Sequence, residues 1–197
     1  MKKTLTIAGA ILFFASMIAC ADEALFLDDF ESGSIKNWRI DAKNIPYWNV
    51  EKIDNNYILN GAGPSGLNGG SDTWQDYSFK AKIEILSGGC ELAFRVTPEG
   101  RYYIGFDTVK GAFYLDKDKP WGVKHHLKGF SVPLDSYKWY TINVTAKRNN
   151  IKVFMGKDML FEYTDNSEPL LKGGIQIISL NNSEVRFDDI SVENLKN

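Results

Sequence analysis

The sequence predicts an all-β protein with one domain, a sandwich or a barrel. Apolar and polar residues alternate over long stretches, short turn motifs separate these stretches, and no helical spacing of apolar residues persists for twelve residues beyond the N-terminal segment. The chain has 197 residues, of which 44% are hydrophobic. That is enough for a single core and too short for two ordinary domains and a linker.

The N-terminal segment, residues 1–19, has the pattern of a secretory signal peptide. Lys2 and Lys3 precede an uncharged apolar run. The run ends at Ala19-Cys20, which is similar to the lipobox of bacterial lipoproteins. That resemblance implies that Cys20 is lipidated and becomes the first mature residue. A plain signal peptide, or an uncleaved anchor with an incidental cysteine, is the alternative.

The predicted organisation places a short tether at residues 20–24 and the β-rich domain at residues 25–197. A lipid anchor at Cys20 implies a location in the bacterial cell envelope, and we expect the outer membrane or the cell surface. With Cys20 lipidated, Cys90 is the remaining thiol and no intrachain disulfide can form; we expect Cys90 to be a small buried residue. The formal net charge of −2 gives no indication of nucleic-acid binding.

Two strands are predicted most clearly. Residues 77–85 alternate without interruption, as do residues 140–146, and Asn149-Asn150 then turns the chain into residues 151–155. Shorter patterns predict further strands at residues 25–30, 48–51, 57–60, 90–96, 102–109, 112–115, 160–163, 174–180 and 184–193.

Two stretches are predicted to be irregular. Residues 61–72 contain five glycines, too few hydrophobic residues for a strand, and no GK[ST] ending of a phosphate-binding loop. Residues 117–132 contain Trp121, His125 and His126, and we expect a loop of the kind that often carries function. The adjacent histidines lack the spacing of a zinc site, and in an extended segment their rings would point in opposite directions.

A series of short motifs follows in order along the chain. They are Asp28-Asp29-Phe30-Glu31, Trp38, Trp48-Asn49-Val50, Trp74-Gln75-Asp76-Tyr77, Phe94-Arg95, Tyr102-Tyr103, Trp139-Tyr140, Gly173-Gly174-Ile175 and Phe187-Asp188-Asp189-Ile190. This series resembles the concanavalin A-like lectin/glucanase superfamily over almost the whole mature chain. It is most similar to laminin-G-like and family-16-like jelly rolls, including the keto-disaccharide hydrolase-like domains of bacterial lipoproteins. The resemblance implies a two-sheet antiparallel β-sandwich, with ligands on the concave face or its rim loops.

Acidic residues near both ends of the domain suggest a calcium site. The resemblance implies that the first and last strands pair, which would bring Asp28 and Glu31 near Asp188 and Asp189. Carboxylates are the oxygen ligands that Ca²⁺ prefers, although only one aspartate of each adjacent pair can face a given ion. We therefore expect a structural Ca²⁺ ion as a cofactor. The alternative is that these aspartates cap strand ends and meet water or Arg186.

Four residues are candidates for contacting a carbohydrate. Alternation leaves Arg95 on one strand, and Tyr103 and Asp107 on the next, opposite to the core set, so neighbouring strands would present all three on one sheet face. Trp121 could fold over the rim. Aromatic faces stack on sugar rings, and planar polar groups fix the hydroxyls. The alternative is a solvated sheet surface with an Arg95–Asp107 ion pair covered by Tyr103.

Catalysis is not indicated by any motif. Family-16 glucanases carry Glu-x-Asp-x-x-Glu on one strand, and this pattern is absent, as is Gly-x-Ser-x-Gly. We therefore expect a lipid-anchored extracytoplasmic domain that binds carbohydrate without catalysis. One alternative is a glycan-active hydrolase of the keto-disaccharide hydrolase-like type, with carboxylates such as Asp107 drawn from separate strands. Another is an envelope interaction protein that retains only the lectin fold.

Overall fold

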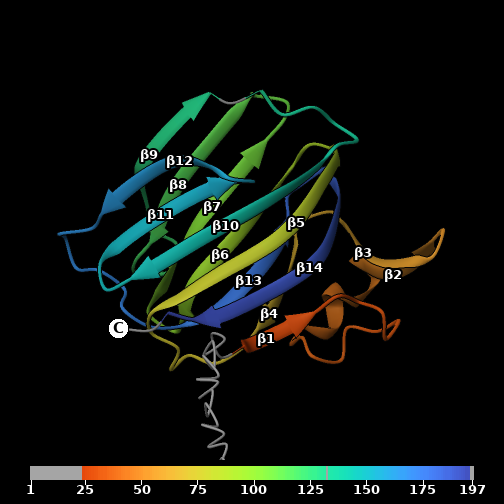
Figure 1. Cartoon of the computed structure of the whole chain (residues 1–197), viewed down its shortest axis with the longest axis horizontal. Coiled ribbons are helices and arrows are strands. Elements are labelled where there is room, and N and C mark those ends of the chain that lie inside the picture. The colour runs from red at the N-terminus through yellow and green to blue at the C-terminus, as the bar shows by residue number, and fades with distance from the viewer. Residues whose placement is uncertain (1–23, 132, 196–197) are drawn as a thin grey trace, which may run out of the picture.

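The computed structural model describes residues 24–131 and 133–195 and shows two antiparallel sheets packed face to face (Figure 1). The two-sheet sandwich implied by the family resemblance is confirmed. The predicted signal peptide and the lipidation site Cys20 lie outside the described residues. Within the part of the chain that the structure describes, no helix is both long and apolar enough to cross a membrane.

The larger sheet has eight strands. In spatial order they are β12 (Asp158–Thr164), β11 (Asn150–Met155), β10 (Trp139–Lys147), β5 (Tyr77–Ser87), β14 (Glu184–Asn194), β3 (Asn56–Ala62) and β2 (Trp48–Ile53), with β1 (Ala24–Asp28) paired to β14. The predicted pairing of the first and last strands is therefore confirmed. A short 3-10 helix, η1 (Ala42–Tyr47), leads into β2.

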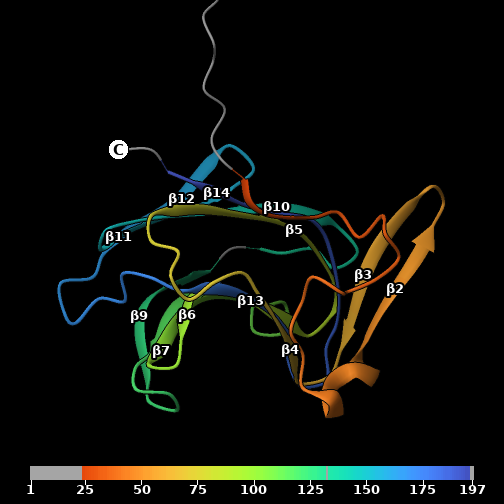
Figure 2. The same ribbon diagram turned by 90° about the horizontal axis from the view of Figure 1, so that it is seen from below.

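The smaller sheet has six strands. Their order is β4 (Ser65–Gly69), β13 (Gly174–Ser179), β6 (Gly89–Thr97), β7 (Gly100–Asp107), β8 (Ala112–Asp118) and β9 (Lys124–Ser131). Seen from below, this sheet curves away from the larger one at both ends, so its outer side is concave (Figure 2). In the same view, the β2–β3 hairpin stands at an angle at one end of the larger sheet.

The core lies between the sheets and follows the predicted alternation. On β5, Phe79, Ala81 and Ile83 are buried, while Lys80 and Lys82 point outward. Cys90 is also buried in this core, as expected, and burial raises the pKa of its thiol. The alternating apolar residues therefore fix which face of each strand is available to a ligand.

Two strands were not predicted. The glycine-rich stretch contains β4, and the stretch around the histidines contains β9, so both expectations of irregular structure were wrong there. Both are edge strands, which are hydrogen-bonded to one neighbour: β4 to β13 and β9 to β8. An edge strand needs fewer apolar side chains than a central strand, and in β4 the central Leu67 is fully buried.

Candidate functional site

The concave side of the six-stranded sheet carries a continuous set of polar and aromatic side chains, which we call the polar face. On β6 and β7, core residues such as Leu92 and Ile104 alternate with outward residues such as Glu91 and Tyr103. The polar face comprises Glu91, Arg101, Tyr103, Tyr114, Asp116, Asp118, Trp121, Lys124, His126 and Gln176. These residues come from every strand of the smaller sheet except β4, and Trp121 comes from the loop between β8 and β9.

Arg101 links several members of the polar face. Its Nη1 donates a hydrogen bond to Gln176 Oε1 at 2.6 Å, and its Nε donates to Asp118 Oδ2 at 3.2 Å. Its Nη2 lies 3.6 Å from Glu91 Oε2. Arginine suits this position because its planar guanidinium presents several donors in one fixed geometry.

Two aromatic rings flank the same guanidinium. The Arg101 Cζ atom lies 4.7 Å from the ring centroid of Tyr103 and 5.1 Å from that of Trp121. Trp121 is held at the rim by a hydrogen bond from its Nε1 to the Thr97 carbonyl oxygen at 2.9 Å, and it remains 43% exposed. The rim thus offers an accessible aromatic plane next to fixed hydrogen-bond donors.

Tyr114 lies across the middle of the polar face. Its ring passes over Gly105, where a Cβ atom would lie 2.0 Å from Tyr114 Cζ, so a residue with a side chain would displace the ring. The Tyr114 hydroxyl donates to Glu91 Oε1 at 3.2 Å. Lys124 Nζ lies 4.8 Å from the centre of the same ring. Gly105 therefore makes room for the ring of Tyr114.

A buried carboxylate anchors the far end of the polar face. Asp116 is fully buried, and its Oδ1 lies 2.7 Å from Nδ1 of His126. Its Oδ2 lies 2.7 Å from Nζ of Lys124. The His126 side chain itself is exposed, so a carboxylate orients an accessible imidazole.

Burial alters the acidity of this surface. Desolvation raises the pKa of Glu91, and the positive charge of Arg101 opposes that rise. Desolvation also raises the pKa values of Tyr103 and Tyr114, so both phenols stay protonated donors at neutral pH. With three carboxylates against Arg101 and Lys124, the face is close to neutral and rich in both donors and acceptors.

Two of the four predicted carbohydrate contacts lie on this surface. Tyr103 and Trp121 both flank Arg101, although Tyr103 is buried beneath its neighbours. Asp107 lies at the end of β7, where its Oδ1 accepts hydrogen bonds from the backbone N–H groups of Val109 and Lys110 at 3.1 and 3.0 Å. Its carboxylate therefore closes the β7–β8 turn and is engaged with its own backbone.

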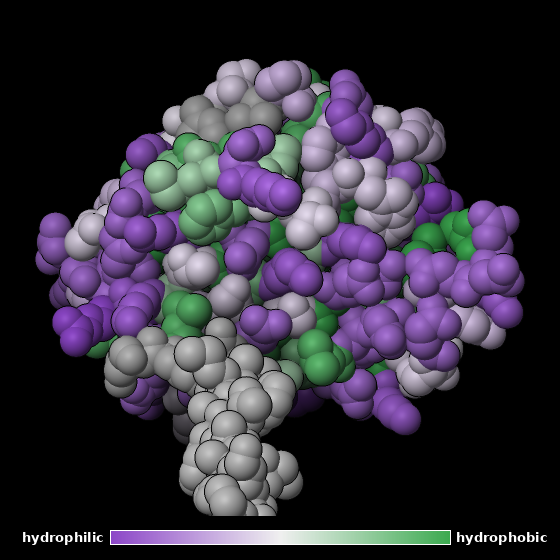
Figure 3. Space-filling view, in the orientation of Figure 1, coloured by the Kyte–Doolittle hydropathy of each residue, from purple (hydrophilic) through white to green (hydrophobic). Residues whose placement is uncertain are grey.

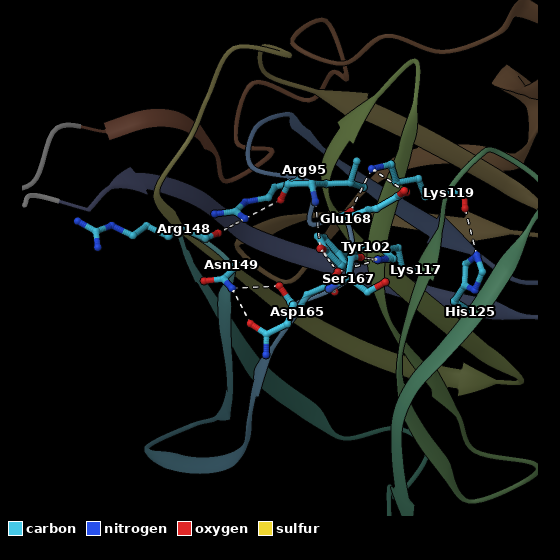
Figure 4. Close-up of polar contacts among 12 residues, drawn as sticks. Arg95, Tyr102, Lys117, Lys119, His125, Arg148, Asn149, Asp165, Ser167 and Glu168 are labelled. Atoms are coloured by element: carbon cyan, nitrogen blue, oxygen red, sulfur yellow. Dashed lines mark hydrogen bonds and ion pairs between the residues drawn. The ribbon is translucent and has the colours of Figure 1, made fainter.

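The predicted position of Arg95 was wrong. Its side chain is fully buried, and its guanidinium donates to the carbonyl oxygens of Leu170, at 2.6 Å, and Arg148 (Figure 4). Arg95 has a φ of 51°, and the β6–β7 register shifts between Phe94 and Thr97, which interrupts the alternation. The alternative ion pair with Asp107 was wrong too, because Arg95 faces Asp76.

A second polar network joins the two sheets at the edge next to Arg95. Asp165 Oδ2 accepts hydrogen bonds from Lys117 Nζ at 2.7 Å and from the Tyr102 hydroxyl at 2.6 Å (Figure 4). His125 Nε2 lies 3.1 Å from the Lys119 carbonyl oxygen, on this side of β9. Because His126 contacts Asp116 on the polar face, the two rings lie on opposite sides of the strand, as predicted. The network ties the sheet edges together.

The sequence analysis missed most of the polar face. Arg101 lies two residues before Tyr103 on the same strand, so its side chain points to the same face of the sheet. That spacing could have identified Arg101 as a member of the site. Asp116 and Asp118 have the parity of Tyr114 on the next strand, but they became significant only once β9 was known to pair with β8.

The predicted metal ligands near β1 make hydrogen bonds within the protein. Asp28 Oδ2 accepts from Trp38 Nε1 at 2.9 Å, and its Oδ1 accepts from the backbone N–H of Phe30 at 3.0 Å. Glu31 Oε1 accepts from the backbone N–H of Tyr57 at 2.9 Å. These two carboxylates therefore hold the loop that follows β1.

The predicted ligands on β14 also have partners. Asp188 Oδ2 accepts a hydrogen bond from Asn56 Nδ2 at 2.9 Å, and Asp189 pairs with Lys82. Among residues 24–131 and 133–195, no three His, Cys, Asp or Glu side chains are arranged to hold a metal ion. Calcium binding stays a prediction; a fall in melting temperature on addition of EDTA would support it, since a ligand of the folded state stabilises that state.

Comparison with known sequences gives one distant relative. No protein-family model matches the chain. An uncharacterized protein of Methanocaldococcus jannaschii is 28% identical over 124 residues, which cover 61% of this chain and 54% of the relative. The chain thus spans about half the length of the curated relative that it matches.

Comparison with solved structures establishes the fold. A Bacillus subtilis protein of unknown function with a galectin-like fold has a TM-score of 0.67 at 14% identity, covering 87% of this chain and 96% of that one. The carbohydrate-binding module CBM66 of Bacillus subtilis has a TM-score of 0.64 at 14% identity, covering 80% and 96%. A Bacteroides ovatus GH16 protein from a mixed linkage glucan PUL, in complex with a G4G4G3G product, has a TM-score of 0.62 at 12% identity, covering 85% and 99%. The chain therefore has a concanavalin A-like jelly-roll fold, as the motif series implied.

Proposed function

We propose that this protein binds a neutral carbohydrate on its polar face, without catalysis, as a domain anchored to the cell envelope through a lipid on Cys20. The observation that carries the proposal is the arrangement around Arg101. A guanidinium held by Gln176 and two carboxylates lies beside the exposed ring of Trp121. Such a combination suits a pyranose, whose apolar face stacks on an aromatic ring while its hydroxyls bond to fixed polar groups.

The charge balance of the polar face supports a neutral ligand. Glu91 and Asp118 are paired with Arg101, and Asp116 is paired with Lys124. An acidic glycan would meet three carboxylates, so like-charge repulsion disfavours it. The similarity in fold to a carbohydrate-binding module supports a carbohydrate as the ligand.

The proposal is tested by binding to a glycan array, followed by calorimetry with the best neutral oligosaccharide. We expect Trp121→Ala to weaken binding about tenfold, which corresponds to a loss of about 1.4 kcal/mol. Met159→Ala is the matched control, because Met159 is exposed on β12 of the other sheet, and it should leave the affinity unchanged. Equal affinities for the wild type and Trp121→Ala would show that the sugar does not bind at the polar face.

A hydrolase is the second candidate, and one observation favours it. The buried Asp116 orients the exposed His126, and burial raises the pKa of Glu91, so this face carries an oriented base and an acid of raised pKa. Released reducing sugar that disappears in Asp116→Asn would support catalysis. Sugar binding without any product would support the first proposal. If neither sugar binding nor released reducing sugar is detected, and an envelope protein is recovered by pull-down, an interaction protein that retains only the fold would be favoured.

The lipid anchor is tested separately. Metabolic labelling with a fatty-acid analogue should mark the wild-type protein and should not mark Cys20→Ser. Persistent labelling of Cys20→Ser would reject the proposed lipobox and leave the proposal for the polar face unaffected.

A further inference from the structure

A second hollow lies on the opposite side of the molecule, on the outer face of the larger sheet. It has a volume of about 390 Å³, within the range of small-ligand pockets. It lies where the angled β2–β3 hairpin meets the sheet, and Figure 2 shows the tip of this hairpin rising beside the outer side of the sheet. Its polar and aromatic lining residues are Asn56, Lys82, Glu84, Trp139, Arg186 and Asp188.

The polar lining residues are held in fixed positions by cross-strand pairing. Arg186 of β14 lies opposite Glu84 of β5, and its Nη1 donates to Glu84 Oε2 at 3.0 Å. Its Nε also donates to Asn60 Oδ1 at 3.2 Å, so the guanidinium is anchored twice. A ligand in the hollow would therefore meet preorganised groups on a rigid sheet.

Asp188 is a nearly buried carboxylate at the floor of the hollow. Asn56 of the hairpin donates to its Oδ2 at 2.9 Å, and the backbone N–H of Asp189 donates to its Oδ1 at 2.8 Å. Each oxygen has lone pairs left for a further donor. An aspartate is costly to bury, and a hydroxyl-bearing ligand would add further hydrogen bonds to these two oxygens.

Trp139 provides an aromatic wall. It is the first residue of β10, lies opposite Glu84 in the register, and is 39% exposed. Trp38 and Trp48, in contrast, are buried in the core and bond to Asp28 and Ser65 through their indole nitrogens. Trp139 is therefore accessible to a ligand, unlike these two core tryptophans.

The net charge of the hollow indicates the class of ligand. Lys82 and Arg186 are the cations of the lining, and Glu84 and Asp188 are its anions. Because Lys82 also pairs with Asp189 beside the hollow, the site has no excess of positive charge that would select an acidic glycan, while it offers many donors and acceptors. The surrounding face is mostly hydrophilic (Figure 3). We propose that this hollow is a second carbohydrate-binding site, which holds a neutral sugar ring against Trp139 with its hydroxyls bonded to Arg186, Glu84 and Asp188.

The second site is independent of the polar face. The two surfaces belong to different sheets and face away from each other, because each is the outer side of its own layer. With both sites occupied, one molecule would link two glycan chains, and its avidity for a polysaccharide would exceed that of either site.

The indole N–H signals of the five tryptophans provide a test that reports on both sites in one spectrum. The ¹⁵N-labelled protein is titrated with laminaritetraose, cellotetraose, xylotetraose and mannotetraose, with tetragalacturonic acid as a charged control. Trp→Phe variants assign the signals. We expect saturable shifts of the Trp139 signal with at least one neutral tetraose, and an affinity at least tenfold lower for tetragalacturonic acid. The signals of the buried Trp38 and Trp48 should stay constant.

The outcomes separate the two sites. Shifts of Trp139 without shifts of Trp121 support the second site and argue against the polar face. Shifts of Trp121 alone overturn the second site, and the absence of shifts at both overturns both proposals for neutral glycans.

Substitutions complete the test. Trp139→Ala should weaken binding at the second site about tenfold, whereas Val109→Ala, at an exposed residue that follows β7 of the other sheet, should leave it within twofold. Asp188→Asn keeps the size of the side chain and an oxygen acceptor for Asn56, and it should still weaken binding at least threefold. Unchanged affinity in both Trp139→Ala and Asp188→Asn would overturn the assignment.

Discussion

Arg101→Met tests how the polar face is held together. Arg101 lies between Glu91 and Asp118, and the three side chains are only 15%, 10% and 12% exposed. Methionine fills much of the same volume with an adaptable apolar chain. The substitution would therefore leave two nearly buried carboxylates without the cation that lies between them.

The size of the effect follows from this burial. Exposed ion pairs contribute about 0–1 kcal/mol, whereas breaking a buried pair costs about 3–5 kcal/mol. Arg101 lies closer to the buried case, and it also loses its hydrogen bond to Gln176. We expect the free energy of unfolding to fall by about 2–3 kcal/mol at pH 7.

The loss should depend on pH. Burial already raises the pKa of Glu91, and Arg101 opposes this rise, so the substitution raises that pKa further. A carboxyl group whose pKa is higher in the folded protein than in the unfolded chain destabilises the fold. This destabilisation begins as the pH rises through the unfolded pKa and reaches its full size once the pH exceeds the folded pKa. Below the unfolded pKa of a glutamate, about 4.3, both states are protonated and this part of the loss disappears. About 1 kcal/mol should remain at pH 4 from the lost hydrogen bond.

Urea unfolding at pH 7.5, 5.5 and 4.0 measures these differences. The double variant Arg101→Met/Glu91→Gln should recover at least about 1 kcal/mol at pH 7.5 relative to Arg101→Met, because one uncompensated carboxylate is gone. A loss that is the same at all three pH values, with no recovery in the double variant, would refute the electrostatic account of the polar face.

Three further substitutions test other parts of the structure. Gly105→Ala should displace the ring of Tyr114, lower the free energy of unfolding by about 1–3 kcal/mol and weaken glycan binding on the polar face, as measured by urea unfolding and calorimetry. Arg95→Met should cost about 3 kcal/mol in the same unfolding assay yet leave glycan affinity within twofold, since this side chain is buried away from the polar face; a large loss of affinity with unchanged stability would contradict its position. Burial would raise the pKa of Asp165, but the hydrogen bond from Lys117 outweighs it and the pKa is lowered overall. The stability that Asp165 contributes is therefore present above the pKa of the unfolded chain and is lost as the pH falls through the pKa of the folded protein. Asp165→Asn should therefore flatten the acid side of the stability profile, and an unchanged acid limb would count against this ion pair.

The fold could be predicted because the alternation of apolar and polar residues in a strand is visible within a short stretch of sequence. On β5, every second residue from Tyr77 to Ile85 is buried, as the pattern indicated. The edge strands β4 and β9 escaped prediction because the sheet supplies their stability through one neighbour, so the glycines of β4 and the polar residues of β9 are tolerated.

The site could be predicted only in part, because it depends on pairing and on one irregular residue. The register shift after Phe94 turns Arg95 inward, and alternation carries no sign of such a bulge. Contact between His126 and Asp116 arises from a second shift, between Leu115 and Asp116 in the β8–β9 register. Both depend on which strands are neighbours, which a single sequence does not state.

If the polar face binds a sugar as proposed, its contacts indicate which interactions the sugar would replace. Asp116 makes short contacts, at 2.7 Å, to both His126 and Lys124, and a ligand would gain little by replacing them. The longer contacts are those between Arg101 and Glu91, at 3.6 Å, and between the Tyr103 hydroxyl and Asp118, at 3.5 Å. Sugar hydroxyls can replace these weaker interactions at small cost, because each group keeps a second partner on the face or a free lone pair. Under the proposed function, a ligand on this face would therefore exchange hydrogen bonds with groups that are already held in place.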